Sequence, residues 1–328
     1  MWGRTLGCIV TLILSLLAVP LAAHAQPAVK VPRLGVLVPG VPPGEPGGVF
    51  DRFRQGLRDL GYVEGQTVAL EIRWDEYHPE RWPDLAADLV RLRVDLIVAG
   101  TTAAARAAQY ATSTIPIVMA ISADPVGDGL VASLARPGGN VTGLSIMTPE
   151  LTGKRLELLQ EAVPGLSRVA VLWWSGPPSG LLPHHEEAAR AAGLQLLPLA
   201  VRGPEEFAGA FQAAIEGHAQ ALIMQWGPLF GTHRARLAEL ALASRLPTMA
   251  GDPGYAKAGG LMDYGANQIE SWYRAATYVH KILQGTKPGD LPVEQPTTFK
   301  LVINLKTAKA LGITMPPSLL ILADEVIQ

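Results

Sequence analysis

VDLIVAG (94–100), TTAAARAAQYATST (101–114), IPIVMAISADPVGDGL (115–130) and VASLARPGGNVTGLSI (131–146) follow one another directly in the chain. The pattern predicts strand, helix, strand, helix and strand. The two helices are expected to begin just after strand ends, at 101–102 and at 124–125. In an open parallel sheet, ligands bind beyond the carboxyl ends of the strands, where helix N-termini present free N–H groups. A functional site is therefore expected at these two corners.

The composition indicates a soluble globular protein with large buried sheets. The chain has 328 residues, of which 48% are hydrophobic and 17% charged, and its formal net charge is −2. This length allows two domains. The small net charge gives no electrostatic footprint for nucleic acid. The single cysteine, Cys8, excludes an intrachain disulfide and a cysteine-based zinc site.

Residues 1–25 are typical of a secretory signal peptide. Arg4 supplies a positive n-region, an apolar run covers 6–17, and a small-x-small tripeptide ends at Ala25. We expect cleavage after Ala25 and a periplasmic mature protein. The alternative is a transmembrane anchor, which needs about 20 apolar residues, more than this run supplies. Lipidation is not expected, because Cys8 precedes the apolar run.

The rest of the chain predicts two similar α/β blocks followed by a tail. The expected strands are 33–38, 67–74, 94–99, 168–174, 194–201, 221–226, 247–250 and 261–265, and the expected helices are 50–60, 82–90, 148–163, 184–192, 204–217, 232–244, 268–283 and 305–311. Strands that alternate with helices in this way predict parallel, doubly wound sheets. The extra units in the tail suggest that the chain returns to each lobe.

Long phrases of the chain resemble one family. They are FRQGLRDLGYVEGQ (53–66), RWPDLAADLVRLRVDLIVAGTTAAARAA (81–108), TSTIPIVMAISADPVGDGLVASLARPGGNVTGLS (112–145), ELTGKRLELLQEAVPGLSRVAVLW (150–173) and FKLVINLKTAKALGITMPPSLLILADEVI (299–327). The chain resembles the ABC-transporter substrate-binding proteins whose best-known members bind tryptophan and related amino acids.

The resemblance implies the type I periplasmic-binding-protein fold. That fold has two Rossmann-like α/β lobes, a three-crossover hinge and a ligand cleft between the lobes. We expect the N-terminal lobe to comprise 30–146 plus 249–288, and the C-terminal lobe to comprise 147–248 plus 289–328.

The resemblance also implies the solute-binding component of an ABC importer. Such a protein captures a small carboxylate-bearing solute, here an amino acid or an aromatic acid, by lobe closure and delivers it to an inner-membrane permease. We expect a monomer without cofactor, catalytic residue or metal. Two alternatives stay open, a ligand-sensing module for a membrane sensor and an exported α/β enzyme. The absence of a G-x-G-x-x-G fingerprint, a P-loop and a nucleophile elbow argues against the enzyme.

The first candidate ligand residues stand at the two strand ends of the opening stretch. Thr101 and Thr102 begin a helix, so their hydroxyls and the free N–H groups can hold a carboxylate with help from the helix dipole. Ser122, Ala123 and Asp124 stand at the next strand end. The alternative for both groups is plain helix capping, and Asp124 precedes a proline, as an N-cap residue often does.

Further candidates come from the second half of the chain. Asp263 is placed to pair with a ligand ammonium, and Tyr264 to hydrogen-bond with the ligand or stack on it. Asp252 is a candidate for the same kind of ligand contact as Asp263. The alternative for all three is a structural turn. His184 and His185 lack a third ligand at sensible spacing, so we do not expect metal binding there.

The last candidates would form the walls of the cleft. Trp174 and Trp226 each close a strand, and their faces suit a flat or apolar ligand body; the alternative is burial in the core. Ser175 belongs to the loop beside Trp174. Pro39 and Gly40 would supply backbone groups from the loop after the first strand.

Overall fold

A computed structural model describes residues 31–42, 48–175, 182–225, 227–251 and 253–328. The expected signal peptide, 1–25, lies outside the described residues. The segment Pro32–Gln328 forms one compact unit. Within the described ranges, no helix is both long and apolar enough to cross a bilayer.

The first half of the chain builds a five-stranded, all-parallel sheet in the order β2-β1-β3-β4-β5. Its elements are β1 (Arg33–Val38), α2 (Val49–Asp59), β2 (Ala69–Trp74), α3 (Trp82–Arg91), β3 (Leu96–Ala99), α4 (Thr102–Ala111), β4 (Ile117–Ser122) and β5 (Val141–Ser145). A short 3-10 turn, Pro79–Arg81, precedes α3.

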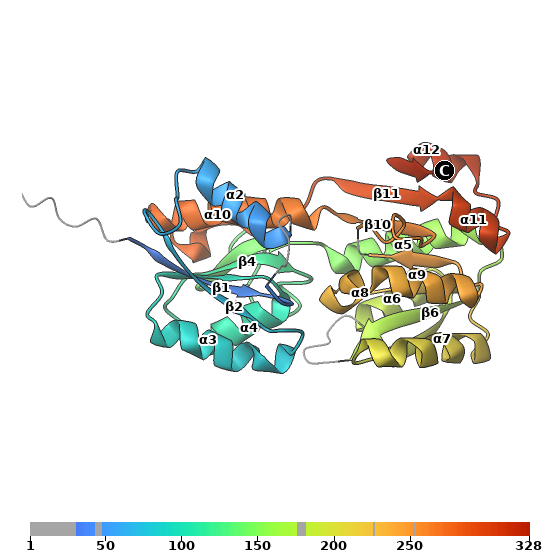
Figure 1. The fold of residues 1–328 in the computed structure, drawn as a ribbon, viewed down its shortest axis with the longest axis horizontal. Coiled ribbons are helices and arrows are strands. Elements are labelled where there is room, and N and C mark those ends of the chain that lie inside the picture. The colour runs from blue at the N-terminus through green and yellow to red at the C-terminus, as the bar shows by residue number, and fades with distance from the viewer. Residues whose placement is uncertain (1–30, 43–47, 176–181, 226, 252) are drawn as a thin grey trace, which may run out of the picture. The chain divides into compact units, whose positions relative to one another are not determined.

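Both faces of this sheet are covered by helices (Figure 1). Leu34 and Val36 of β1 pack into a core with Phe53 of α2 and with Trp272. Leu37 points to the other face and joins the core that α3 and α4 cover. The strand is apolar on both faces for this reason, as expected of a central parallel strand.

The second sheet has seven strands in the order β12-β11-β10-β9-β8-β6-β7. Its strands are β6 (Arg168–Trp174), β7 (Gln195–Val201), β8 (Ala221–Met224), β9 (Thr248–Ala250), β10 (Met262–Ala266), β11 (Phe299–Asn304) and β12 (Glu325–Ile327). Its helices are α5 (Thr148–Ala162), α6 (Leu182–Ala191), α7 (Phe207–Glu216), α8 (Pro228–Thr232), α9 (Arg234–Ala243), α11 (Leu305–Leu311) and α12 (Pro317–Leu322). Only β10 and β11 pair antiparallel among the described strands.

The chain passes between the two sheets three times, after β5, after β10 and before β11. Helix α10 (Gln268–Leu283) returns from the second sheet to pack against α2 and β4. The last crossover is tied to β5, since Ser145 N donates to Glu294 O at 2.9 Å and Glu294 N donates to Gly143 O at 3.0 Å. The two mainly parallel α/β sheets with three crossovers confirm the expected fold class.

The expected lobe boundaries placed residues 249–288 in the N-terminal lobe, whereas the structure divides this range between the two sheets. Strands β9 and β10 belong to the seven-stranded sheet, and α10 alone from this range packs on the five-stranded one. Packing explains the difference, because Met249 and Met262 fill the core of the second sheet, whereas Trp272 fills that of the first. A helix expected after Asp124 is also replaced by turns, and the glycines Gly127 and Gly129 (φ +70°) favour them.

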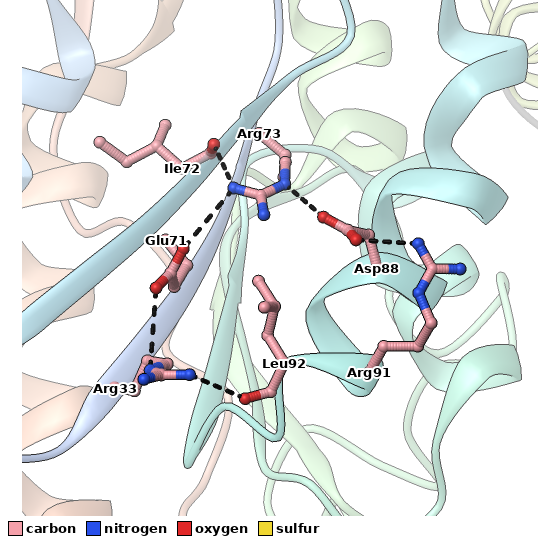
Figure 2. Close-up of polar contacts among 7 residues, drawn as sticks. All are labelled: Arg33, Glu71, Ile72, Arg73, Asp88, Arg91 and Leu92. Atoms are coloured by element: carbon pink, nitrogen blue, oxygen red, sulfur yellow. Dashed lines mark hydrogen bonds and ion pairs between the residues drawn. The ribbon is translucent and has the colours of Figure 1, made fainter.

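The edge strand β2 carries a row of partly exposed ion pairs (Figure 2). Glu71 lies 3.7 Å from Arg33 and 3.8 Å from Arg73. Arg73 donates to Asp88 at 2.7 Å, Arg91 contacts the same carboxylate at 2.8 Å, and these two bonds lower the pKa of Asp88. Partly exposed pairs of this kind contribute little stability. Their charges do protect an edge strand from pairing with another chain.

Replacing Gly143 with alanine is expected to destabilise the fold. Gly143 has φ +135°, and an added Cβ would lie 2.6 Å from the backbone nitrogen of Met119 and closer still to its carbonyl oxygen. The two strands would have to separate, so we expect a loss of about 3 kcal/mol or more in urea unfolding. Gly139→Ala is the control, since nothing lies within 4 Å of its added Cβ. Equal midpoints for the two variants would contradict this account.

Candidate ligand-binding site

A cavity lies at the carboxyl ends of strands from both sheets. Its empty volume, with the open mouth included, is about 970 Å³. The first sheet and its loops contribute Pro39, Asp75, Tyr77, Pro79, Trp82, Thr101, Thr102, Ala103, Ala123 and Asp128, and the second contributes Trp174, Arg202, Gln225, Gly227, Leu229 and Phe230. This is the place where open parallel sheets bind ligands.

The N-terminus of α4 forms one polar wall. Thr101 is the N-cap residue, and its hydroxyl accepts the Ala104 N–H at 3.1 Å. The Thr102 hydroxyl accepts the Ala123 N–H at 3.1 Å and lies 3.5 Å from the hydroxyl of Ser122. Each threonine hydroxyl keeps its own hydrogen as a donor. The first N–H groups of α4 have no partner inside the helix, so this corner favours an anionic group.

A buried carboxylate forms a second polar wall. Asp75 follows β2 directly and is 5% exposed. Its Oδ1 accepts the N–H groups of Gly40 at 2.6 Å and Tyr77 at 3.2 Å. Burial raises its pKa, although these bonds and the nearby Arg81 oppose the rise. The ionised form therefore lacks part of the stabilisation that water or a bound cation would give it.

A second acid, Asp128, faces the same cavity. Arg106 holds it, with the guanidinium 2.8 Å from Oδ1 and 3.1 Å from its carbonyl oxygen. Burial nevertheless raises the pKa of Asp128, and the neighbouring Asp124 adds to the rise. The one cation among the described lining residues is Arg202, which is exposed. The acids of this cavity thus favour a ligand that carries a positive group.

The rest of the lining is mainly apolar. Trp82 and Phe230 are each 2% exposed and are held in the cores of the two sheets. Trp174 and Leu229 are partly buried against the second of these cores. Such walls suit a flat or apolar ligand body.

The structure brings five of the expected site residues into this cavity. They are Pro39, Thr101, Thr102, Ala123 and Trp174. Gly40 and Ser122 lie directly behind the lining through their hydrogen bonds to Asp75 and Thr102. Trp226 and Asp252 lie outside the described residues.

Four expected residues have other contacts and are not in the described lining. Asp263 is 2% exposed and accepts the N–H groups of Gly254 and Ala256 at 3.2 and 2.8 Å. The Tyr264 ring lies 6.1 Å from that of Phe299. The other two are Asp124, whose Oδ1 accepts the Gly127 N–H at 2.9 Å, and Ser175, which donates its N–H to Val201 O at 3.0 Å. A ligand role for these four stays a prediction.

The sequence analysis did not predict two residues that line the cavity, the buried acid Asp75 and the aromatic Tyr77. Asp75 and Tyr77 follow β2 directly, so the rule that ligands bind at strand ends would have found them. Gln225 likewise follows β8 directly, and Phe230 lies in α8, the helix that comes after it.

Two contacts join the loops of the two sheets. Thr232 of α8 donates to the Tyr77 hydroxyl at 3.4 Å, and His184 of α6 lies 3.5 Å from Asp124. Both sheets therefore contribute residues to the walls of the cavity, whose mouth is open. In the described part of the chain, no group of three His, Cys, Asp or Glu side chains could hold a metal ion.

Two α/β sheets joined by three crossovers, with a cavity at their strand ends, have the fold of the type I periplasmic binding proteins. The family model for ABC transporter substrate binding proteins matches residues 48–327. The chain belongs to that family.

Three known proteins are similar to the chain. A tyrosine-binding protein from Clostridioides difficile (strain R20291) is 27% identical over 261 residues, which are 79% of this chain and 75% of that protein. A structure from Streptococcus pneumoniae, described as the ABC domain in complex with L-Trp, is 28% identical, covers 90% of this chain and 99% of its own, and has a TM-score of 0.81. A conserved domain protein from Vibrio cholerae O1 biovar El Tor has the same identity, coverage of 90% and 100%, and a TM-score of 0.81.

Proposed function

We propose that this protein captures an aromatic amino acid, or failing that an aromatic acid, and delivers it to an ABC permease in the inner membrane. The observation that carries the proposal is the combination of a helix N-terminus, a buried carboxylate and apolar walls in one cavity. The L-Trp complex of one relative and the tyrosine-binding description of another support it.

Each part of such a ligand has a matching group in the cavity. The ligand carboxylate binds at the N-terminus of α4, where it accepts hydrogen bonds from the Thr101 and Thr102 hydroxyls and from the first N–H groups. The ammonium binds the buried carboxylate of Asp75. Among the described lining residues, the one cationic side chain is the exposed Arg202. The ring takes the walls of Trp174 and Phe230. No bond is made or broken, so the protein is not an enzyme.

The remaining expectations fit this role. A signal peptide over 1–25 with cleavage after Ala25 would place the mature protein in the periplasm as a monomer, with the permease as partner and no nucleic acid. A sensor module that reports the same ligand to a membrane receptor uses the same cleft. Loss of uptake in a strain that lacks this protein favours transport over sensing.

Titration calorimetry tests the ligand class. We expect one molecule of L-tryptophan or L-tyrosine to bind per chain, and its two single-charge analogues to bind much more weakly. For tryptophan these are tryptamine, which lacks the carboxylate, and indole-3-propionate, which lacks the ammonium. Because each analogue leaves a desolvated charge unpaired, the loss should be about tenfold or more. If no amino acid and no aromatic acid gives a measurable heat of binding, the proposal is wrong.

A further inference from the structure

The loop between β2 and α3 holds two consecutive non-glycine residues in the left-handed region. Glu76 has φ 55° and Tyr77 has φ 62°. Side chains with a Cβ rarely adopt this conformation, and two in succession are strained unless the surroundings impose them. Neither position needs a large side chain for packing, since Glu76 is exposed and Tyr77 is 46% exposed.

The surroundings of this loop do impose the conformation. Asp75 Oδ1 accepts the N–H groups of Gly40 and Tyr77 at 2.6 and 3.2 Å, and Glu76 N donates to Gly40 O at 2.9 Å. Arg81 lies 2.7 Å from the Glu76 carboxylate. The loops after β1 and β2 are thus bonded to each other, with the strained pair between them.

The consequence of the strain is the position of one aromatic side chain. Tyr77 lines the cavity, and an added Cβ at Gly40 would lie 3.3 Å from its ring. Its hydroxyl accepts from Thr232 of α8, which belongs to the second sheet, at 3.4 Å. A relaxed loop would direct residue 77 elsewhere, and the ring would leave both the cavity and α8.

We propose that the strained turn at 75–78 exists to hold Tyr77 over the mouth of the cavity, where it retains the bound ligand and favours a flat one. Tyr77 is then a ligand-retaining residue, held against Thr232 of α8. This inference rests on the proposed function, because it assigns a residue of the same site. It adds a structural reason for the unusual backbone at Glu76 and Tyr77.

A pair of glycine substitutions tests the proposal. Glycine adopts φ near +60° without strain, so Tyr77→Gly and Glu76→Gly should each melt at or above the wild-type temperature. Only Tyr77→Gly removes the ring. We expect it to weaken L-tryptophan and L-tyrosine binding by about tenfold or more, mainly through faster dissociation. Tyr77→Phe keeps the ring and should stay within about threefold.

The outcomes separate this inference from the proposed function. If wild type binds the two amino acids and Tyr77→Gly binds them equally well, the inference is overturned and the proposed function stands. Weakening in Tyr77→Phe as large as that in Tyr77→Gly would likewise overturn it, because the effect would then not come from loss of the ring. A clear drop in the melting temperature of both glycine variants would contradict the claim that the backbone at Glu76 and Tyr77 is strained. If wild type binds neither amino acid, both proposals fail.

Discussion

Acidification from pH 7 to pH 4 is expected to remove about 3 kcal/mol of folding free energy through one buried imidazole, that of His185. The side chain is 2% exposed, and neither ring nitrogen has a hydrogen-bond partner among the described residues. Burial first, and then the charge of Arg155, lowers the pKa of His185 to about 3. A protonated ring at this place would be both desolvated and beside a guanidinium.

The sign of the effect follows from the two protonation equilibria. In the unfolded chain His185 has an ordinary pKa of about 6.5, so the unfolded state takes up its proton first as the pH falls. The stability that His185 provides is therefore complete above pH 6.5 and declines as the pH falls towards 3. At about 1.4 kcal/mol for each pKa unit, two to three units account for the predicted loss at pH 4.

His185→Leu isolates this contribution, because leucine fills a similar volume and has no proton to bind. Urea unfolding of both proteins at pH 7 and pH 4 gives the comparison. Other groups titrate equally in both, so the wild type should lose about 3 kcal/mol more than the variant. His78→Gln, at an exposed histidine paired with Glu80, serves as the control and should behave as wild type. A His185→Leu variant that loses as much stability as wild type would refute the assignment.

The second large effect concerns Asp75, whose replacement by asparagine should weaken an amino-acid ligand by about 30- to 150-fold, or roughly 2–3 kcal/mol. Asparagine keeps an Oδ1 acceptor for the N–H groups of Gly40 and Tyr77, so the loop is preserved. The lost charge leaves the ligand ammonium desolvated without a partner. Asp88→Asn removes a partly exposed charge outside the cavity lining and should bind as wild type.

The pH dependence of Asp75 gives a second signature. Burial raises the pKa of this carboxyl above its usual 3.8, so its ionised form is disfavoured in the free folded protein. A raised pKa contributes stability that is present below the unfolded pKa and is lost as the pH rises through the folded one. Asp75→Asn should thus leave the free protein at pH 7 as stable as wild type or more so.

As the pH rises, ligand affinity should increase, whereas the contribution of Asp75 to folding stability decreases. Binding of an ammonium needs the carboxylate, so wild-type affinity should fall as the pH drops through the raised pKa of Asp75, while the variant stays flat. Calorimetry between pH 4 and pH 8 measures both curves. Parallel curves for the two proteins would rule out Asp75 as the partner of the ammonium.

The sequence predicted the fold well because its central strands are short, apolar and buried on both faces. The run at 33–38 lies in β1 as expected, and the alternating run ending at Trp74 lies in β2 at the edge of its sheet. The sheet that β9 and β10 join could not be predicted in this way. Their apolar residues suit either core, and long-range packing of Met249 and Met262 decides between them.

The candidate site was predicted in part for a similar reason. A threonine pair after a strand marks the N-terminus of α4 plainly, and Thr101 and Thr102 do line the cavity. Nothing local in the letters Asp75-Glu76-Tyr77 signals left-handed backbone, because that conformation depends on bonds to Gly40 from a distant loop. Asp263 and Tyr264 also follow a strand-end pattern, yet backbone N–H groups and Phe299 are their partners.

A crystal structure of the protein with L-tryptophan or L-tyrosine tests the central claim most directly. The account predicts density in the cavity, with the ligand carboxylate on the N–H and hydroxyl groups of Thr101 and Thr102, the ammonium within hydrogen-bonding distance of Asp75, and the ring against Trp174 and Phe230. Density for the amino acid at any other place, or with its ammonium turned away from Asp75, would contradict it.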